Sequence, residues 1–162
     1  MSKKKTCTLI SDYTPELVYA EEDCSKLKQT LYDTVEQLIT EKGVTKFISS
    51  LTIGSDMFFA ETVLQLKQHY PYISLEIVFA CEIEASIWSC RLAERYYCIA
   101  ERCDKETYIS KRYTPSCFDE RELYKLNNSE EIIFAINDDL SVYSYIEKAK
   151  RTSKTITSLK QR

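Results

Sequence analysis

Apolar runs of strand length alternate with segments of helical periodicity from one end of the chain to the other. The runs lie at residues 6–10, 46–50, 73–79, 106–109 and 131–136, with a shorter run at 155–157. Between the runs, apolar residues recur every three or four positions, as at Leu27, Leu31 and Val35, which predicts helices. Nearly continuous apolar strands that alternate with helices are typical of a parallel sheet covered on both faces. The sequence therefore predicts a three-layer α/β fold of the Rossmann type, with a mostly parallel sheet of five to six strands.

The order of the strands can also be predicted. Right-handed crossovers between parallel strands leave few arrangements of such a sheet. We expect the order 3-2-1-4-5, with residues 155–157 as a sixth strand at the edge. In sheets of this kind a ligand binds beyond the carboxyl ends of the strands, where the direction of chain travel across the sheet reverses. The loops that follow the strands are therefore the places to look for a binding site.

Length, charge and cysteine content narrow the number of domains, the kinds of partner and the compartment that we expect for this chain. Its 162 residues fit a single domain, with a core expected over about residues 5–152 and a basic tail behind it. The net charge of −3 argues against nucleic acid as the main partner. No apolar run is long enough for a membrane span and no signal peptide is evident, so we expect a cytoplasmic protein. Seven cysteines with no C-x-x-C pair indicate reduced thiols and no zinc site.

Glycine is scarce, and this scarcity bears on ligand binding. Loops that bind phosphate usually need glycine for close approach of the backbone, but only Gly43 and Gly54 occur here. Gly54 and Asp56 follow the second strand and lead into a helix, whose N-terminus suits an anion. Asp56 would repel phosphate but could accept a hydrogen bond from a ribose hydroxyl; alternatively, it caps the helix. Ser11 and Asp12 follow the first strand and are expected at the same rim.

Later loops add four more candidates. Glu84 and Trp88 lie four residues apart and would present a carboxylate beside a stacking ring, or serve as a dipole partner and a packing residue. Arg121 could bind a ligand phosphate or lie in solvent, and Tyr113 would border the cleft. The chain has no G-x-S-x-G, H-E-x-x-H, P-loop or G-x-G-x-x-G motif. We therefore assign no catalytic and no metal-binding residue.

Residues at a series of positions, spread from about Thr6 to about Lys150, follow one another in a characteristic order. The set comprises Ile48-Ser49, Gly54, Asp56, Ala60-Glu61, Trp88, Tyr96-Tyr97, Tyr113-Thr114-Pro115, Arg121 and Ser129. In this order the residues resemble the YpsA-like family of the SLOG superfamily. That Rossmann-like superfamily includes the DNA-processing protein DprA and the "lonely guy" phosphoribohydrolases. The resemblance implies binding of a nucleotide or an ADP-ribose-like ligand.

The expected binding loops depart from the family pattern. Residues 11–15 lack the glycine and arginine of the family's T-G-x-R-P, and Ser50 and Leu51 stand where a pair of glycines is expected. Glu84 replaces a glutamine, and Glu122 replaces the asparagine of an Arg-Asn pair. A late G-G-T is Leu140-Ser141-Val142 in this chain. These changes indicate a degenerate site with weakened phosphate binding, and they remove the phosphoribohydrolase signature.

We therefore expect a non-catalytic binding or sensor domain for a nucleotide-like ligand, with no resident cofactor or metal. The predicted site comprises Ser11, Asp12, Gly54, Asp56, Glu84, Trp88, Tyr113 and Arg121. One alternative is a scaffold or regulatory protein that has lost the ligand and acts through protein contacts. A third interpretation is an N-glycosidic hydrolase with Asp56 or Glu84 as general acid or base. Homodimers are common in the superfamily, so a homodimer stays open as well.

Overall fold

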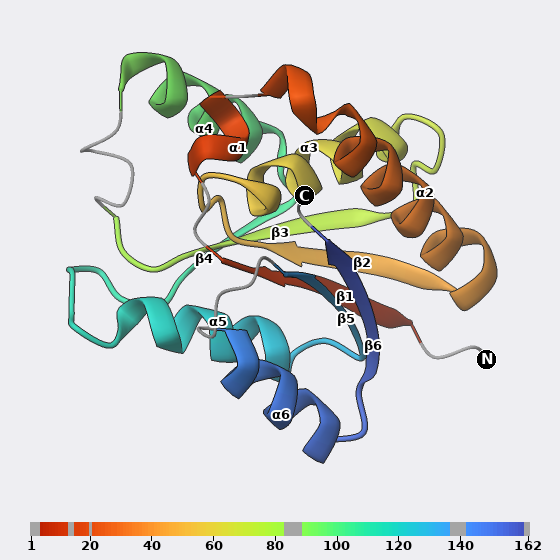
Figure 1. The fold of residues 1–162 in the computed structure, drawn as a ribbon. Helices are drawn as coiled ribbons and strands as arrows, with labels where there is room; N and C mark the ends of the chain where they lie inside the picture. The colour runs from red at the N-terminus through yellow and green to blue at the C-terminus, as the bar shows by residue number, and fades with distance from the viewer. Residues whose placement is uncertain (1–3, 13–14, 20, 83–88, 137–141, 161–162) are drawn as a thin grey trace.

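One parallel sheet with helices on both faces forms the centre of the molecule (Figure 1). The computed structural model describes residues 4–12, 15–19, 21–82, 89–136 and 142–160. The strands are β1 (Lys5–Ser11), β2 (Val44–Ser49), β3 (Ser74–Phe79), β4 (Lys105–Tyr108), β5 (Glu131–Ile136) and β6 (Thr155–Lys160). All neighbouring strands run parallel. The predicted α/β class, of the Rossmann type, is therefore confirmed.

The helices divide between the two faces of the sheet. They are α1 (Pro15–Tyr19), the 3-10 helix η1 (Glu21–Cys24), α2 (Ser25–Lys42), α3 (Ser55–Lys67), α4 (Cys90–Arg102), α5 (Cys117–Asn127) and α6 (Tyr143–Arg151). Helices α1 to α4 cover one face, and α5 and α6 cover the other (Figure 1). Gly43 ends α2 in the left-handed conformation, with a φ of 71°, and its N–H donates to the carbonyl of Leu38. A glycine in this conformation is a common way to end a helix, because it has no side chain to strain the left-handed backbone.

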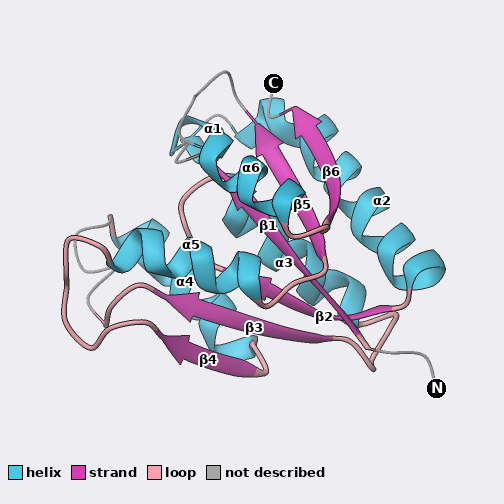
Figure 2. Cartoon of the chain, turned by 90° about the horizontal axis from the view of Figure 1, so that it is seen from below, coloured by secondary structure: helices cyan, strands magenta, loops and turns pink. Residues whose placement is uncertain are grey.

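The strand order is β4-β3-β2-β1-β5-β6, which corrects the predicted position of the fourth strand. That strand lies outside β3 and not beside β1. The reason is that α4 packs on the same face as α3, where Leu92, Tyr96 and Ile99 join the core. A right-handed crossover on an unchanged face adds the next strand farther outward. The chain turns back only with α5, which contacts β3 and β1 on the opposite face (Figure 2).

Two apolar cores hold the layers together. The larger core lies between the sheet and α2, α3 and α4, and includes an edge-to-face pair of Phe47 and Phe59 with ring centroids 6.1 Å apart. The smaller core lies under α5 and α6, around Leu126, Phe134 and Ile146. Strand β6 extends to Lys160, so most of the predicted basic tail belongs to the sheet. Within the described ranges, no helix has the length and apolar character needed to cross a membrane.

Candidate functional site

The carboxyl ends of β1 and β2 bring two of the predicted loops into contact. Ser11, the last residue of β1, donates a hydrogen bond from Oγ to the Asp56 carboxylate in the first turn of α3. Ser50, which follows β2, donates to Asp56 Oδ1 at 3.0 Å. Asp56 is 2% exposed, and Asp12, next to Ser11, is buried too. Ser11, Asp12 and Asp56 therefore lie at one rim of the sheet, as the topology predicts.

Gly54 forms the turn from this rim into α3. Its φ of 126° and ψ of −136° lie in a region that side chains disfavour, so the turn requires glycine. Gly54 is the N-cap residue of α3, and its carbonyl accepts a hydrogen bond from the Phe58 N–H at 3.3 Å. The alternative role of Asp56 as the helix cap is thus wrong. Its carboxylate accepts hydrogen bonds from neighbouring side chains instead.

Lys125, on α5, completes a buried group of charges that the sequence analysis missed. Its Nζ lies 3.1 Å from Asp56 Oδ1 and 3.0 Å from Ser50 Oγ. The same ammonium lies 3.0 and 3.3 Å from the two carboxylate oxygens of Glu122. Lys125 is 0% exposed. Its position four residues after Arg121 places both cations on one side of α5, and this spacing is the signal that could have identified it.

Arg121 also belongs to this group rather than to solvent. It is 5% exposed, and its Nη2 donates to Thr52 Oγ1 at 3.0 Å. Its Nε donates to Glu122 Oε1 at 3.2 Å, and the guanidinium lies 5.1 Å from the ring centroid of Phe118. Asp56, Arg121, Glu122 and Lys125 are called the buried charge cluster below. The cluster joins the loop after β2, helix α3 and helix α5.

The cluster contains two acids and two bases, which compensate one another. Burial raises the pKa of Asp56; the positive charge of Lys125 opposes this rise, and the negative charge of Glu122 adds to it. Both oxygens of the Asp56 carboxylate already accept hydrogen bonds, from Ser11, Ser50 and Lys125. A carboxylate that is enclosed and bonded in this way is poorly placed to take a proton from a substrate.

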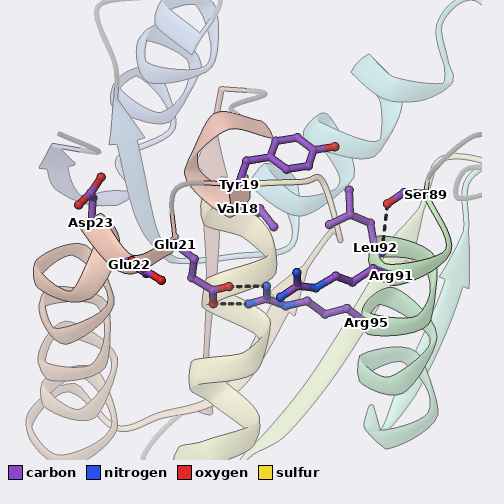
Figure 3. Close-up of a pocket in the computed structure, with 9 residues that line it drawn as sticks. All are labelled: Val18, Tyr19, Glu21, Glu22, Asp23, Ser89, Arg91, Leu92 and Arg95. Carbon is purple, nitrogen blue, oxygen red and sulfur yellow. Dashed lines mark hydrogen bonds and ion pairs between the residues drawn. The ribbon is translucent and has the colours of Figure 1, made fainter.

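A cavity of about 630 Å³ opens at the same end of the sheet, between α1, η1 and the start of α4 (Figure 3). It is lined by Val18, Tyr19, Glu21, Glu22, Asp23, Ser89, Arg91, Leu92 and Arg95. Its volume lies within the range that small-molecule pockets occupy. One wall is acidic and the other carries two arginines. None of these lining residues was among the predicted site residues.

The arginine wall is organised by the first turns of α4. Ser89 caps the helix and accepts a hydrogen bond from the Leu92 N–H. Arg95 binds Glu21 at 3.0 and 3.1 Å on one side and the Glu61 carboxylate on the other. Arg91 is exposed and makes no ion pair with any residue that the structure describes. Figure 3 shows both guanidinium groups extending from α4 toward Glu21.

The predicted site residues fall in three places. Five lie at the rim of the sheet: Ser11, Asp12, Gly54, Asp56 and Arg121. Tyr113 is 60% exposed in the segment before α5, with its ring 6.3 Å from that of Phe118. Glu84 and Trp88 lie outside the described residues. None of the described candidates lines the cavity, so their role in ligand binding stays a prediction. Within the described ranges, no three His, Cys, Asp or Glu side chains come together to hold a metal ion.

Comparison with known families and proteins supports the resemblance found in the sequence. Residues 13–160 match the model of the YspA SLOG family, YpsA. A UPF0398 protein of Halalkalibacterium halodurans is 28% identical over 117 residues. That match spans 70% of this chain but only 62% of the relative's length.

A solved structure with a similar fold is DNA processing protein A from Helicobacter pylori. The TM-score is 0.64 at 16% identity, and the likeness covers 98% of this chain and 66% of that protein. The study of that structure concerns its single-stranded DNA binding mode. At this level of identity the likeness shows the shared fold alone.

Proposed function

Because the chain belongs to the YspA SLOG family, we propose that it is a non-catalytic binding domain for a nucleotide-like ligand. The observation that carries this proposal is the cavity between α1, η1 and α4, where Arg91 lies beside the N-terminus of α4. A helix N-terminus and an arginine both favour an anionic group. The cavity also lies at the carboxyl end of the sheet, where folds of this type bind their ligands.

The cavity offers a partner for each part of a nucleotide. Arg91 and the first turn of α4 would hold a phosphate, because guanidinium groups match phosphate geometry. Tyr19 is 74% exposed and would present its ring to a base. Glu22 and Asp23, on the opposite wall, supply acceptors for ribose hydroxyls. Arg95 is engaged by Glu21 and Glu61, so its part is to fix the shape of the wall.

The hydrolase interpretation named Asp56 or Glu84 as general acid or base; Glu84 lies outside the described residues, and the position of Asp56 argues against that role for Asp56. Hydrolysis of an N-glycosidic bond needs an acid or base within reach of the substrate. Asp56 is enclosed in the buried charge cluster and does not line the cavity. Among the described residues, those that line the cavity support binding without chemistry best.

A thermal-shift series tests the proposal. Adenosine monophosphate and ADP-ribose should raise the melting temperature, since a ligand at 100 times its Kd stabilises by about 2.7 kcal/mol, whereas adenosine should act weakly. Arg91→Gln should reduce the shift. Arg102→Gln, at the far end of α4, is the matched control and should preserve it. No shift with either phosphorylated ligand, or equal loss in both variants, would contradict the proposal and favour the scaffold alternative.

Single-stranded nucleic acid is a second candidate ligand, and the segment before α5 favours it. Lys111 and Arg112 are exposed beside Tyr113, and the ring of Phe118, 42% exposed, lies 6.3 Å from that of Tyr113. Exposed rings next to cations are what single strands stack on. The net charge of the whole chain led us to expect no such partner. The similar fold of the Helicobacter pylori protein, whose study concerns single-stranded DNA, makes the test worthwhile.

Fluorescence anisotropy with a labelled oligothymidine distinguishes this candidate. Binding should weaken steeply between 50 and about 200 mM salt. Tyr113→Ala should weaken it by about 1–3 kcal/mol, the usual value of one stacked base. Tyr143→Ala, which removes an exposed ring from α6, should change nothing. Absence of binding at low salt would eliminate the candidate.

A further inference from the structure

The edge of the sheet formed by β6 carries cations that the proposed function does not use. Strand β6 pairs with β5 alone among the described strands, so it ends the sheet on the side away from β4 (Figure 2). Five basic residues lie on β6 or on the part of the chain that leads into it: Lys148, Lys150, Arg151, Lys154 and Lys160. No acidic residue follows Glu147 in the chain. Strand β6 and these five residues are called the basic edge below.

The backbone of β6 presents a row of hydrogen-bonding groups that no described strand pairs. The Thr155 N–H donates to the carbonyl of Glu130 at 3.0 Å, so Thr155 faces β5. Successive residues of a strand turn their N–H and C=O groups to opposite sides, and the register with β5 continues to Lys160 without a bulge. Ile156, Ser158 and Lys160 therefore direct these groups outward, where an added strand can bind them.

The cations lie on one face of this edge. Ile156 packs against the core beneath α5 and α6, and side chains alternate along a strand, so Ser158 and Lys160 lie on that face too. Helix α6, which carries three of the five cations, contacts β6. None of the five cations makes an ion pair with a residue that the structure describes. Their charge is therefore available to a partner.

We propose that the basic edge binds an extended acidic segment of another protein, which adds to the sheet as a strand beside β6. In such complexes main-chain hydrogen bonds supply affinity, and complementary charge supplies selectivity. The single sign of the charge decides the partner, because two copies of this edge repel each other whereas an acidic segment complements it. Lysines also protect open edges from aggregation, but only Lys160 lies within the strand, so protection does not account for the other four cations.

The strand also sets the length and pattern of the partner. The six residues of β6 span about 20 Å, at about 3.3 Å per residue. A partner of about six residues covers this length. Because side chains alternate between the two faces of a strand, its acidic residues should occupy every second position, on the face that α6 covers.

Fluorescence anisotropy tests the charge complementarity, using a labelled peptide of alternating threonine and glutamate about ten residues long. Arg151→Glu combined with Lys154→Glu should weaken binding about tenfold, because each substitution replaces an attraction by a repulsion. Arg102→Glu combined with Lys26→Glu is the matched control. It changes the net charge equally, on α4 and α2, and should alter binding by at most about twofold. Absence of peptide binding at low salt, or equal weakening in both double variants, would overturn the proposal.

Ser158→Pro tests the backbone pairing. The substitution removes an outward N–H and leaves the hydrogen bonds from β6 to β5 in place, an arrangement in which edge strands tolerate proline. Peptide binding should weaken at least tenfold, while Ser158→Ala should preserve it.

A second measurement does not depend on the folding of a variant. N-methylation of every second peptide residue should abolish binding for the set that faces β6 and spare it for the other set. Binding that survives both Ser158→Pro and both methylation patterns would overturn the proposal and indicate a surface for any polyanion, which labelled oligothymidine would occupy as well as the peptide. These assays contain no nucleotide, so their outcome is independent of ligand binding in the cavity.

Discussion

Lys125→Met is the substitution that tests most directly whether the buried charge cluster stabilises the rim. Methionine keeps most of the volume of the side chain and removes its charge. The ammonium lies within 3.3 Å of four oxygen atoms, from Asp56, Ser50 and Glu122, and Lys125 is 0% exposed. Its loss leaves the buried Asp56 carboxylate without the cation it is paired with, which costs about 3–5 kcal/mol, whereas Glu122 keeps its contact with Arg121. That is a large share of the roughly 5–15 kcal/mol that stabilises a typical domain.

Urea denaturation at pH 7.5 measures this loss as a change in the free energy of unfolding. Lys150→Met is the control, because Lys150 lies exposed on α6 and should change stability by about 0.5 kcal/mol at most. A double-mutant cycle with Asp56→Asn isolates the pair. In the Asp56→Asn background, Lys125→Met should cost much less, because a neutral amide does not need the ammonium.

The free energy of unfolding that Lys125→Met loses should also depend on pH. Burial raises the pKa of Asp56 above its ordinary value of 3.8, and the charge of Lys125 limits that rise. Without Lys125 the pKa of Asp56 rises further, so the folded state prefers the protonated acid. The variant therefore loses stability as the pH increases from the ordinary pKa of Asp56, which applies in the unfolded state, through the raised pKa of Asp56 in the folded state. The deficit of Lys125→Met should be smaller at pH 5 than at pH 8. The reasoning would be refuted if Lys125→Met lowered the free energy of unfolding by less than about 1 kcal/mol. It would also be refuted if that loss were the same at both pH values and in the Asp56→Asn background.

Two further predictions concern the turn and the cavity wall. Gly54→Ala should lower the free energy of unfolding in urea by about 1–3 kcal/mol, because its φ of 126° is strained for alanine. Gly43→Ala, with a φ of 71° and open space around the added carbon, should cost only about 1 kcal/mol. Arg95→Gln should speed hydrogen exchange in η1. Although burial raises the pKa of Glu21, hydrogen bonds from Arg95 and Lys28 outweigh it and lower that pKa, so this stabilisation is lost as the pH falls through the lowered value. Urea stabilities of Arg95→Gln and the wild type should therefore converge at low pH.

The elements of the fold could be predicted because their signals are local. The spacing of Leu27, Leu31 and Val35 specifies the buried face of α2, and Gly43 specifies its end. The position of β4 could not be predicted in the same way. The apolar stripe of Leu92 and Ile99 would look the same on either face of the sheet. Only packing against α3 decides which face α4 covers, and hence where the next strand is added.

In the site, too, residues with a local sequence signal could be predicted, and residues whose surroundings come from distant parts of the chain could not. Gly54 and Asp56 could be found because they follow a predicted strand at the start of a helix, and Arg121 because an arginine lies in the helix after the fourth strand. Lys125 was missed because a lysine on an amphipathic helix normally lies in solvent. Its burial depends on Asp56, which is 69 residues away in sequence. The cavity was missed for a similar reason, since its wall depends on the Glu21–Arg95 contact across 74 residues.

The return of the chain through α5 has a consequence for the order of folding. Strands β1 to β4 are added side by side in chain order, so each new pairing closes a single connection: α1, η1 and α2 before β2, α3 before β3 and α4 before β4. Strand β5 must instead find β1, where the Thr6 N–H donates to Glu130 across 124 residues. Contacts between such distant residues form slowly. We therefore expect the half built on β1–β4 to assemble early and α5 to dock late, so Lys125 reaches Asp56 only in the last stage of folding.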